Sequence, residues 1–350
     1  MISEKQKPIV RTHQSHVVVN SSAASGKTAT LIERLRFLLD NGADPKKVVA
    51  ITFTNMAAAE ILDRLGNPQG LFVGTVHSFA NYCLLSSSIS TEEAIQNENF
   101  DALFHMVKEN PDCIPQIDHL VLDEAQDSTQ LQFDFILDYI KPKNFLFFGD
   151  TKQSLYSWAG AEPEVFEGLK NREGVSVYSL NENYRNGRNI LNYARKFAWR
   201  AGQDDDSIAM RSFDGQVYEI EHRDEALVNA IKKKEFGDYG EWFVLCRTNA
   251  QIDQVASLFD KEEIPYDTFK QSELTRSELN EKMKDNTVKI LTVHAAKGLE
   301  APNVYVIGCA PYSTEEACVC YVAATRARDL LVWTKPQKKK KSKLKVSNWE

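Results

Sequence analysis

The chain has 350 residues, 43% of them hydrophobic, and a formal net charge of −7. This length allows two globular domains, and we find neither an apolar run that could span a membrane nor a secretory signal, so we expect a cytoplasmic protein without a membrane partner. The six cysteines lack the spacing of zinc ligands and are expected to be reduced. The net charge excludes a uniformly basic protein, although a local patch can still bind nucleic acid.

Short β-rich runs alternate with helical segments along the chain. They are rich in Val, Ile, Leu and Phe without strict alternation, which is typical of strands buried on both faces of a parallel sheet. The first set of predicted strands is Val17–Asn20, Val48–Thr54, Leu71–Thr75, His119–Glu124, Phe145–Asp150 and Val175–Leu180. The second set is Trp242–Cys246, Val288–Val293, Val304–Gly308 and Leu330–Thr334. The predicted helices include Thr28–Asp40, Ala57–Leu65 and Asn189–Ala201. The two sets predict two α/β lobes.

The predicted boundary between the lobes lies near Leu180–Asn186. We therefore expect a first lobe over residues 1–180, a second over 181–336 and a basic tail over 337–350. Residues 81–116 are polar and look like a small helical insertion, and residues 267–286 look like a surface connection. The lysine-rich tail is either a solvated disordered segment or an arm that binds nucleic-acid phosphates, and the two are compatible.

A short loop of small residues connects the first predicted strand to a helix. Its sequence is Ser21-Ser22-Ala23-Ala24-Ser25-Gly26-Lys27-Thr28. The last three residues form the core of a P-loop, in which backbone N–H groups bind phosphates, Lys27 neutralises the β/γ oxygens and Thr28 binds Mg²⁺. The usual first glycine is absent, so a residue that needs a positive φ would be strained. The alternative is an ordinary strand-to-helix turn.

An acidic segment, Asp123-Glu124-Ala125-Gln126-Asp127, follows another predicted strand. Asp123 would hold Mg²⁺ and Glu124 would orient and polarise the attacking water, because phosphoryl transfer depends on positioning and charge neutralisation. The alternative is a turn whose carboxylates cap a helix. The P-loop upstream favours the phosphate site.

Together these segments resemble helicase superfamily 1, and the remaining motifs resemble its UvrD/Rep/PcrA branch. The motifs occur in family order: Gln6, Ile51–Asn55 with Ala57–Glu60, Gly74–Phe79, Gly149–Trp158, Leu180–Arg185, Arg247–Gln251, Val293–Glu300 and Tyr321–Ala327. The resemblance implies two RecA-like parallel-sheet P-loop lobes, with a small helical insertion in the first and with ATP in the cleft between them.

The resemblance also implies roles at the ATP site. Gln6 and Tyr184 would contact the adenine and Glu300 the ribose, although Tyr184 can also be a plain core residue. Gln153 would sense the γ-phosphate from the first lobe. Arginine fingers from the second lobe would reach the same phosphate, or else form structural ion pairs; they are Arg185 and Arg326. The loop residues expected around the phosphates are Ser22, Ala23, Ala24, Ser25, Gly26, Lys27 and Thr28.

Single-stranded DNA is expected along a track of aromatic and polar residues. The aromatic residues expected to stack on bases are Phe53, Tyr156 and Trp158, and the alternative for each is core packing. The residues expected to contact phosphates are Thr54, Thr75, His77 and His294. Phosphate contacts carry no sequence information, so we expect little sequence preference. The resemblance to this branch favours DNA over RNA, and no residue visibly reads a 2′-hydroxyl.

The chain departs from the family in its accessory segments and in several charges. The two large accessory insertions of the family are reduced to residues 81–116 and 267–286. Cationic positions are replaced by Met56, Ala159, Ala317 and Cys318. Together, the motifs and the resemblance predict an ATP-dependent helicase or translocase that acts on single-stranded DNA and at single-strand/duplex junctions. As in the branch that it resembles, we expect movement from 3′ to 5′. We also expect a repair, replication or nuclease partner. The alternative is a helicase-like module that binds nucleic acid or a partner with little or no ATPase activity.

Overall fold

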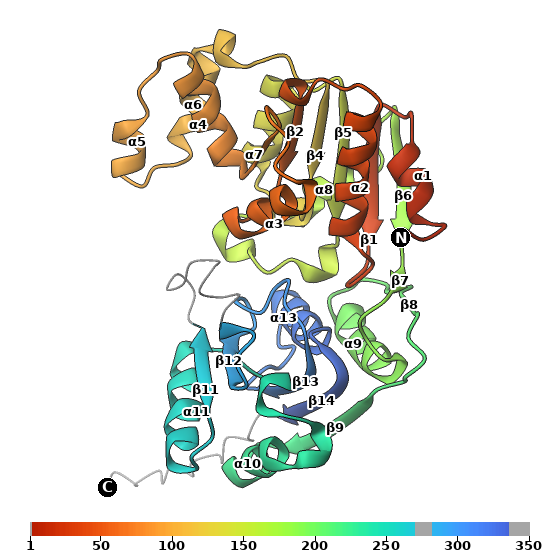
Figure 1. The fold of residues 1–350 in the computed structure, drawn as a ribbon, viewed down its shortest axis with the longest axis vertical. Helices are drawn as coiled ribbons and strands as arrows, with labels where there is room; N and C mark the ends of the chain where they lie inside the picture. Colours follow the sequence, from red (N-terminus) through yellow and green to blue (C-terminus); the bar gives the residue numbers. More distant parts are fainter. Residues whose placement is uncertain (1, 270–281, 336–350) are drawn as a thin grey trace, which may run out of the picture.

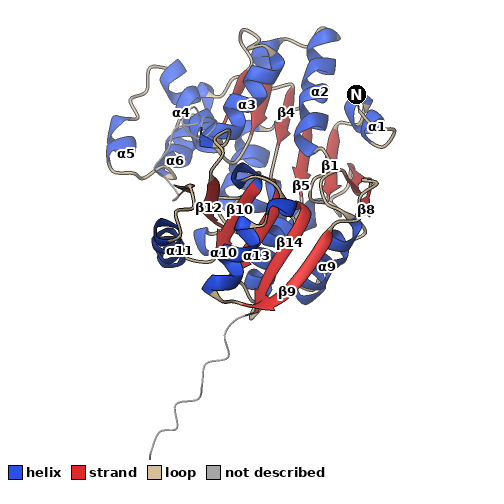
Figure 2. Ribbon diagram, turned by 60° about the horizontal axis from the view of Figure 1, so that its bottom comes forward, coloured by secondary structure: helices blue, strands red, loops and turns tan. Residues whose placement is uncertain are grey.

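The computed structural model describes residues 2–269 and 282–335. These residues form two α/β lobes, drawn one above the other in Figure 1. Each lobe is built on a parallel sheet with helices on both faces, which Figure 2 shows for the second lobe. The predicted fold class is therefore confirmed.

The first sheet holds six strands among the described residues, in the order β3-β2-β4-β5-β1-β6. They are β1 His16–Ser21, β2 Val48–Ile51, β3 Phe72–Gly74, β4 His119–Leu122, β5 Asn144–Gly149 and β6 Val175–Leu180. Strand β1 lies between β5 and the edge strand β6, and it places Val18 beside Phe147 of β5 and Val177 of β6. Because parallel strands all end at one edge of a sheet, the segments that follow β1, β2, β3, β4 and β5 meet there.

Helices of the first lobe cover both faces of its sheet. One apolar core joins helices near the N-terminus to residues such as Val17, Val19 and Phe148, and another lies on the opposite face around Phe79, Phe133 and other residues. The helices of this lobe are α1 Gln6–Arg11, α2 Lys27–Asp40, α3 Asn55–Leu65, α4 Val76–Ser86, α5 Glu92–Gln96, α6 Ala102–Glu109, α7 Gln130–Asp134 and α8 Pro163–Leu169. A π-helical segment, Phe135–Ile140, continues α7.

The second sheet also has six strands in the part of the chain that the structure describes, in the order β11-β12-β10-β13-β14-β9. They are β9 Gln216–Glu221, β10 Trp242–Cys246, β11 Tyr266–Phe269, β12 Val288–Thr292, β13 Ala301–Ile307 and β14 Ala327–Lys335. Its helices are α9 Arg188–Arg200, α10 Asp224–Lys232, α11 Asn249–Lys261 and α13 Thr314–Ala324. Two short strands, β7 Glu182–Asn183 and β8 Ile208–Ala209, pair beside it.

The structure corrects the sequence reading at the edges of the second sheet. β9 and β11 were not predicted, because they are edge strands with polar, partly exposed residues. β11 begins at Tyr266, where we expected a surface connection, and residues 270–281 of that connection lie outside the described residues. The predicted tail over 337–350 lies outside them as well.

Other expectations concern the insertion, the cysteines and the membrane. Residues 81–116 contain the end of α4 followed by α5 and α6, which project from the first lobe in Figure 1. All six cysteines are buried and free, as expected. In the described ranges, no helix combines the length and the apolar character needed to cross a membrane.

Candidate functional site

The loop after β1 has the geometry of a phosphate cradle. Gly26 precedes α2 with a φ of 78°, and the first turn of this helix presents free N–H groups to the loop. Within the described residues, the buried Ser25 hydroxyl lacks a hydrogen-bond partner, and the buried Lys27 ammonium has an ion pair with Glu124 as its close contact. Because an unpaired buried polar atom is costly and an ammonium has three donors, both groups suit the oxygens of a bound phosphate.

The strain that the sequence predicts in this loop falls on Ala24, whose φ is 55°. We expect Ala24→Gly to raise the free energy of unfolding by up to about 1 kcal/mol, because relief of left-handed strain outweighs the chain entropy of glycine. Denaturant titration measures the change. Ala29→Gly, inside α2, should instead destabilise the protein by about 1 kcal/mol. A loss of stability in both variants would contradict strain at Ala24.

Two acidic residues that follow β4 face the loop and differ in their electrostatics. Glu124, with a φ of 53°, places Oε1 3.1 Å from the Nζ of Lys27. Asp123 accepts a hydrogen bond from the Glu124 backbone N–H at 3.0 Å. Burial and the Glu124 charge raise the pKa of Asp123. Burial also opposes ionisation of Glu124, but Lys27 and Lys297 hold its pKa below the ordinary value.

Mg²⁺ fits this asymmetry. Among the described residues, Glu124 forms ion pairs with lysines, whereas Asp123 forms none. Thr28 lies in the first turn of α2, beside the phosphate loop. Carboxylate and hydroxyl oxygens are ligands that Mg²⁺ accepts together with phosphate oxygens and water. A bound cation would reverse the upward shift of the Asp123 pKa.

A buried lysine of the second lobe enters the acidic cluster. Lys297 forms an ion pair with Asp127, its Nζ donates a hydrogen bond to the Gln153 carbonyl at 3.0 Å, and it lies 3.8 Å from Glu124. Burial disfavours its charge, but Asp127 and Glu124 raise the pKa of Lys297. This lysine therefore ties the two lobes together at the candidate catalytic acids.

Arg326 of the second lobe meets the predicted γ-phosphate sensor of the first. Its Nη2 donates to the side-chain oxygen of Gln153 at 3.1 Å, and its other nitrogens donate to the carbonyls of Val322 and Leu299. The side-chain nitrogen of Gln153 donates to Asp150 at 2.7 Å. Burial, with the neighbouring Arg185, lowers the pKa of Arg326 to about 9. An anion between these groups would oppose that shift, because it favours the charged guanidinium.

Arg185 lies close to Arg326 but is paired differently. Its Nε donates to Glu300, and its Nη1 donates to the Thr325 carbonyl at 3.2 Å. The structural ion pair that was the alternative to an arginine-finger role is therefore present, between Arg185 and Glu300. Arg185 would have to release Glu300 to reach a phosphate, and Glu300 would then be free to meet a ribose.

The predicted adenine contacts flank the phosphate loop from two sides. Gln6 is buried and donates from its side chain to the Ser25 carbonyl at 3.1 Å. Tyr184 is 44% exposed, so core packing is excluded for it, and its backbone N–H donates to the Ala24 carbonyl at 3.1 Å. Its hydroxyl donates to Glu182 at 2.6 Å. The Gln6 side chain and the Tyr184 backbone thus contact the phosphate loop directly.

The predicted stacking residues form a connected set of rings. Phe53 stacks on Tyr156 with ring centroids 4.5 Å apart, and Trp158 and His294 each lie 6.3 Å from Tyr156. Phe53 is 38% and Trp158 is 67% exposed, whereas Tyr156 is buried. Phe53 and Trp158 can therefore meet a base in the structure as it stands, and Tyr156 supports them from below. Burial lowers the pKa of His294, so this ring is mostly neutral and suited to a hydrogen bond.

The predicted phosphate contacts of the first lobe begin two helices. Thr54 caps α3 by accepting from the Ala57 N–H, and Thr75 caps α4 by accepting from the Ser78 N–H. His77, in the first turn of α4, is hydrogen bonded to Asp101 at 3.0 Å. The Thr54 and Thr75 hydroxyls therefore stabilise the starts of these helices, in addition to any contact with DNA.

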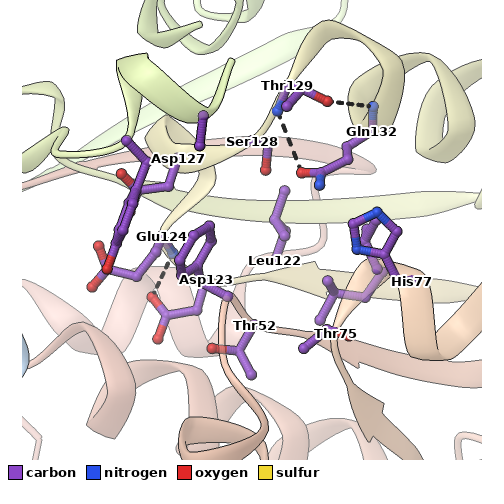
Figure 3. Close-up of a pocket in the computed structure, with 15 residues that line it drawn as sticks. Thr52, Thr75, His77, Leu122, Asp123, Glu124, Asp127, Ser128, Thr129 and Gln132 are labelled. Atoms are coloured by element: carbon purple, nitrogen blue, oxygen red, sulfur yellow. Dashed lines mark hydrogen bonds between the residues drawn. The ribbon is translucent and has the colours of Figure 1, made fainter. Parts of the chain in front are cut away.

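A cavity of about 270 Å³ connects the two predicted sites. Its lining includes the acids Asp123 and Glu124, the ring of Tyr156, and the candidate DNA contacts Thr75 and His77. Figure 3 shows the acids on one side of this cavity and the Thr75 and His77 side chains on the other. Ala159, which stands where the family has an arginine, also lines it. The candidate ATP acids and the candidate DNA contacts thus line the same cavity.

Exposed Trp158 yields a direct prediction. Trp158→Ala should weaken binding of single-stranded DNA by about 1–3 kcal/mol, because a stacking platform is lost. Fluorescence anisotropy with a labelled oligonucleotide measures the affinity. Trp199 is 76% exposed on α9, and Trp199→Ala is the matched control. Equal affinities of the two variants would show that Trp158 does not touch DNA.

Three residues of the network had no role in the sequence analysis. Lys297 and Asp127 stand inside recognised motifs, and the one signal in the sequence is the charge of Lys297 among small and apolar neighbours. Gln126 is fully buried, donates to Glu124 at 2.6 Å and accepts from the Asp150 N–H at 2.9 Å. It therefore fixes the carboxylate that faces Lys27.

Comparison with protein families covers almost the whole chain. The model described as UvrD/REP helicase N-terminal domain matches residues 2–112 and 111–173. The model described as UvrD-like helicase C-terminal domain matches residues 178–281 and 267–338.

Individual relatives agree with these matches. A protein named Probable DNA helicase from Mycoplasma pneumoniae is 24% identical over 94% of this chain and 82% of its own length. The Gabija protein GajB from Bacillus cereus is 29% identical over 52% of this chain and 46% of its own length. The ATP-dependent DNA helicase PcrA from Staphylococcus epidermidis is 25% identical over 76% of this chain and 50% of its own length. The chain spans most of the length of the first relative and about half the length of the other two. Its fold, its candidate site and both family models agree, and the chain belongs to the UvrD/REP helicase family.

Proposed function

We propose that the chain is an ATP-dependent DNA helicase or translocase that hydrolyses ATP between its lobes, residues 1–180 and 181–336. The observation that carries this proposal is that the second lobe supplies two buried cations to the candidate ATP site of the first. Lys297 lies 3.8 Å from Glu124, the partner of Lys27, and Arg326 donates to Gln153. The family match and the names of the relatives support the same activity.

The residues divide the chemistry of hydrolysis between them. Lys27 and the N-terminus of α2 bind the phosphates, and Thr28 with Asp123 would hold Mg²⁺, which neutralises charge on the transferred group. Glu124, kept ionised by its lysines, orients the attacking water and polarises it. Arg326, joined by Arg185 when the latter leaves Glu300, stabilises the charge that develops in the transition state.

Closure of the cleft is the step that links hydrolysis to motion. The γ-phosphate is the group touched from both lobes, so ATP favours the closed arrangement and its hydrolysis removes the bridge. The acids and Tyr156 line the same cavity, which supports a DNA track next to this event. We propose movement in the 3′ to 5′ direction, on single strands and at their junctions with duplex, alongside a repair, replication or nuclease partner.

A second candidate is a nucleic-acid-binding or partner-binding module with little ATPase activity. The observation that favours it is the strained Ala24 in the phosphate loop, together with Ala159 at the wall of the cavity. DNA-stimulated hydrolysis separates this candidate from the motor.

The decisive experiment measures ATP hydrolysis with and without a single-stranded oligonucleotide. We expect strong stimulation by DNA and its loss in Lys27→Ala, because that variant removes the only side-chain cation that the structure places in the described phosphate loop. Lys46→Ala, on the surface of the same lobe, is the matched control. A rate that stays at the level of Lys27→Ala, whatever strand is added, would falsify the motor and leave the binding module.

A further inference from the structure

Away from Lys297 and Arg326, a second contact reaches the Gln153 segment across the lobes. The Thr151 hydroxyl donates to the side-chain oxygen of Gln203 at 2.8 Å, and the Gln203 amide donates to the Thr151 carbonyl at 3.3 Å. Thr151 belongs to the first lobe, and Gln203 lies in the loop after α9 in the second. We call this reciprocal pair the Thr151–Gln203 clasp. The two residues are 52 positions apart in the sequence, and Gln203 lies outside every recognised motif.

The clasp acts on a rigid piece of chain. Residues Thr151–Gln153 form one 3-10 turn, capped by Asp150, which accepts from the Lys152 N–H at 3.2 Å. The Gln153 side chain is bonded to the same Asp150 carboxylate. A displacement of Thr151 therefore moves the γ-phosphate sensor with it.

The other half of the clasp is anchored as well. Asp205, two residues after Gln203, accepts from the Tyr321 hydroxyl at 3.1 Å and from the Ser207 N–H at 3.1 Å. Tyr321 lies in α13, the helix that ends just before Arg326. The loop that carries Gln203 and the segment that carries Arg326 are thus parts of one body.

The clasp is nevertheless accessible to water. Thr151 and Gln203 line an interlobe groove of about 380 Å³, together with Lys152, Lys170 and other polar residues. Hydrogen bonds at such a border contribute modestly, so they can form and break in each cycle. The Thr151 hydroxyl also lies 3.3 Å from a carboxylate oxygen of Glu167, which offers it a partner in its own lobe when the cleft opens.

We propose that Gln203 is a positioning residue for γ-phosphate sensing, which holds the Thr151–Gln153 turn against the second lobe so that Gln153 and Arg326 meet. This inference rests on the proposed ATP site. Without Gln203, the closed cleft would lose one of its interlobe contacts beside those of Lys297 and the shared apolar core, and the population ready to bind ATP would fall. ADP lacks the γ-phosphate and gains little from closure, so its affinity should not depend on the clasp.

The test compares a fluorescent, non-hydrolysable ATP analogue with fluorescent ADP on the full chain. Gln203→Ala should weaken the analogue by about three- to tenfold, the worth of one or two hydrogen bonds, and leave ADP unchanged. In steady state the KM for ATP should rise by the same factor with little change in kcat. Thr151→Val should behave like Gln203→Ala, and Thr151→Ser, which keeps the hydroxyl, should behave like the wild type. Gln254→Ala, an exposed site on α11, is the control.

The double variant Thr151→Val/Gln203→Ala should be no worse than the more severe single one, because both remove the same contact. Equal weakening of the analogue and ADP would mean that Gln203 only supports the fold, and unchanged affinities would show that the clasp has no role. Either result overturns the inference. If the wild-type protein binds the analogue but hydrolyses no ATP, the proposed motor function is wrong and the binding test of the clasp remains valid. If it binds neither nucleotide, the proposed function and the inference about Gln203 are both wrong.

Discussion

Arg326→Ala is expected to lower kcat for ATP hydrolysis by about 10³–10⁵-fold, with a much smaller effect on KM, because an arginine finger acts on charge that develops in the transition state. The guanidinium is 1% exposed and is fixed by the Val322 and Leu299 carbonyls as well as by Gln153. It therefore needs little reorganisation to meet a phosphate. Single-turnover hydrolysis with saturating DNA measures the chemical step directly.

Two further variants make this result specific. Arg326→Lys keeps a cation but loses the forked geometry, so most of the loss should remain. Arg200→Ala removes an exposed arginine at the end of α9 and should change nothing. An Arg326→Ala protein with more than a tenth of the wild-type rate would contradict the finger role and leave Arg326 as a structural link to Gln153.

Lys297→Met should destabilise the protein by about 3–5 kcal/mol and abolish DNA-stimulated hydrolysis, because it leaves Asp127 buried without its cation. The Asp127 side chain is completely buried, and its Oδ1 already lacks a partner among the described residues. Denaturant unfolding gives the stability, and the ATPase assay gives the coupling. Lys261→Ala, an exposed lysine on α11, is the matched control.

A second substitution separates charge burial from catalysis. Asp127→Asn in the Lys297→Met background removes the stranded charge, so most of the lost stability should return. Activity should stay low, since the tie from the second lobe to Glu124 and the Gln153 carbonyl is still absent. Recovery of activity along with stability would mean that Lys297 serves the fold alone.

The sequence predicted those parts of the fold that repeat a burial pattern. Central strands such as β10, buried along its whole length, were found with their ends correct or within a few residues. β9, at the edge of the sheet, holds exposed and half-buried residues without strict alternation. It was missed because a polar edge strand without this period resembles a loop in the sequence.

The site shows the same division. Lys27 and Asp123 lie where strands end in motifs, and such local context could be read from the sequence. The pairing of Lys297 with Asp127 joins residues 170 positions apart, and no pattern along the chain announces it. Gln203 lies in a polar loop without periodicity, so only the folded arrangement brings it to Thr151.

The apolar core of the second lobe does not stop at the lobe boundary. Ala23, Leu155, Tyr156 and Ala161 of the first lobe belong to the same cluster as Val293, Tyr321 and other residues of the second. Either half expressed alone would present this apolar surface to water, which favours aggregation. Halves split after Leu180 should therefore remain in solution only when they are co-expressed, and the intact chain should unfold in one cooperative transition rather than lobe by lobe.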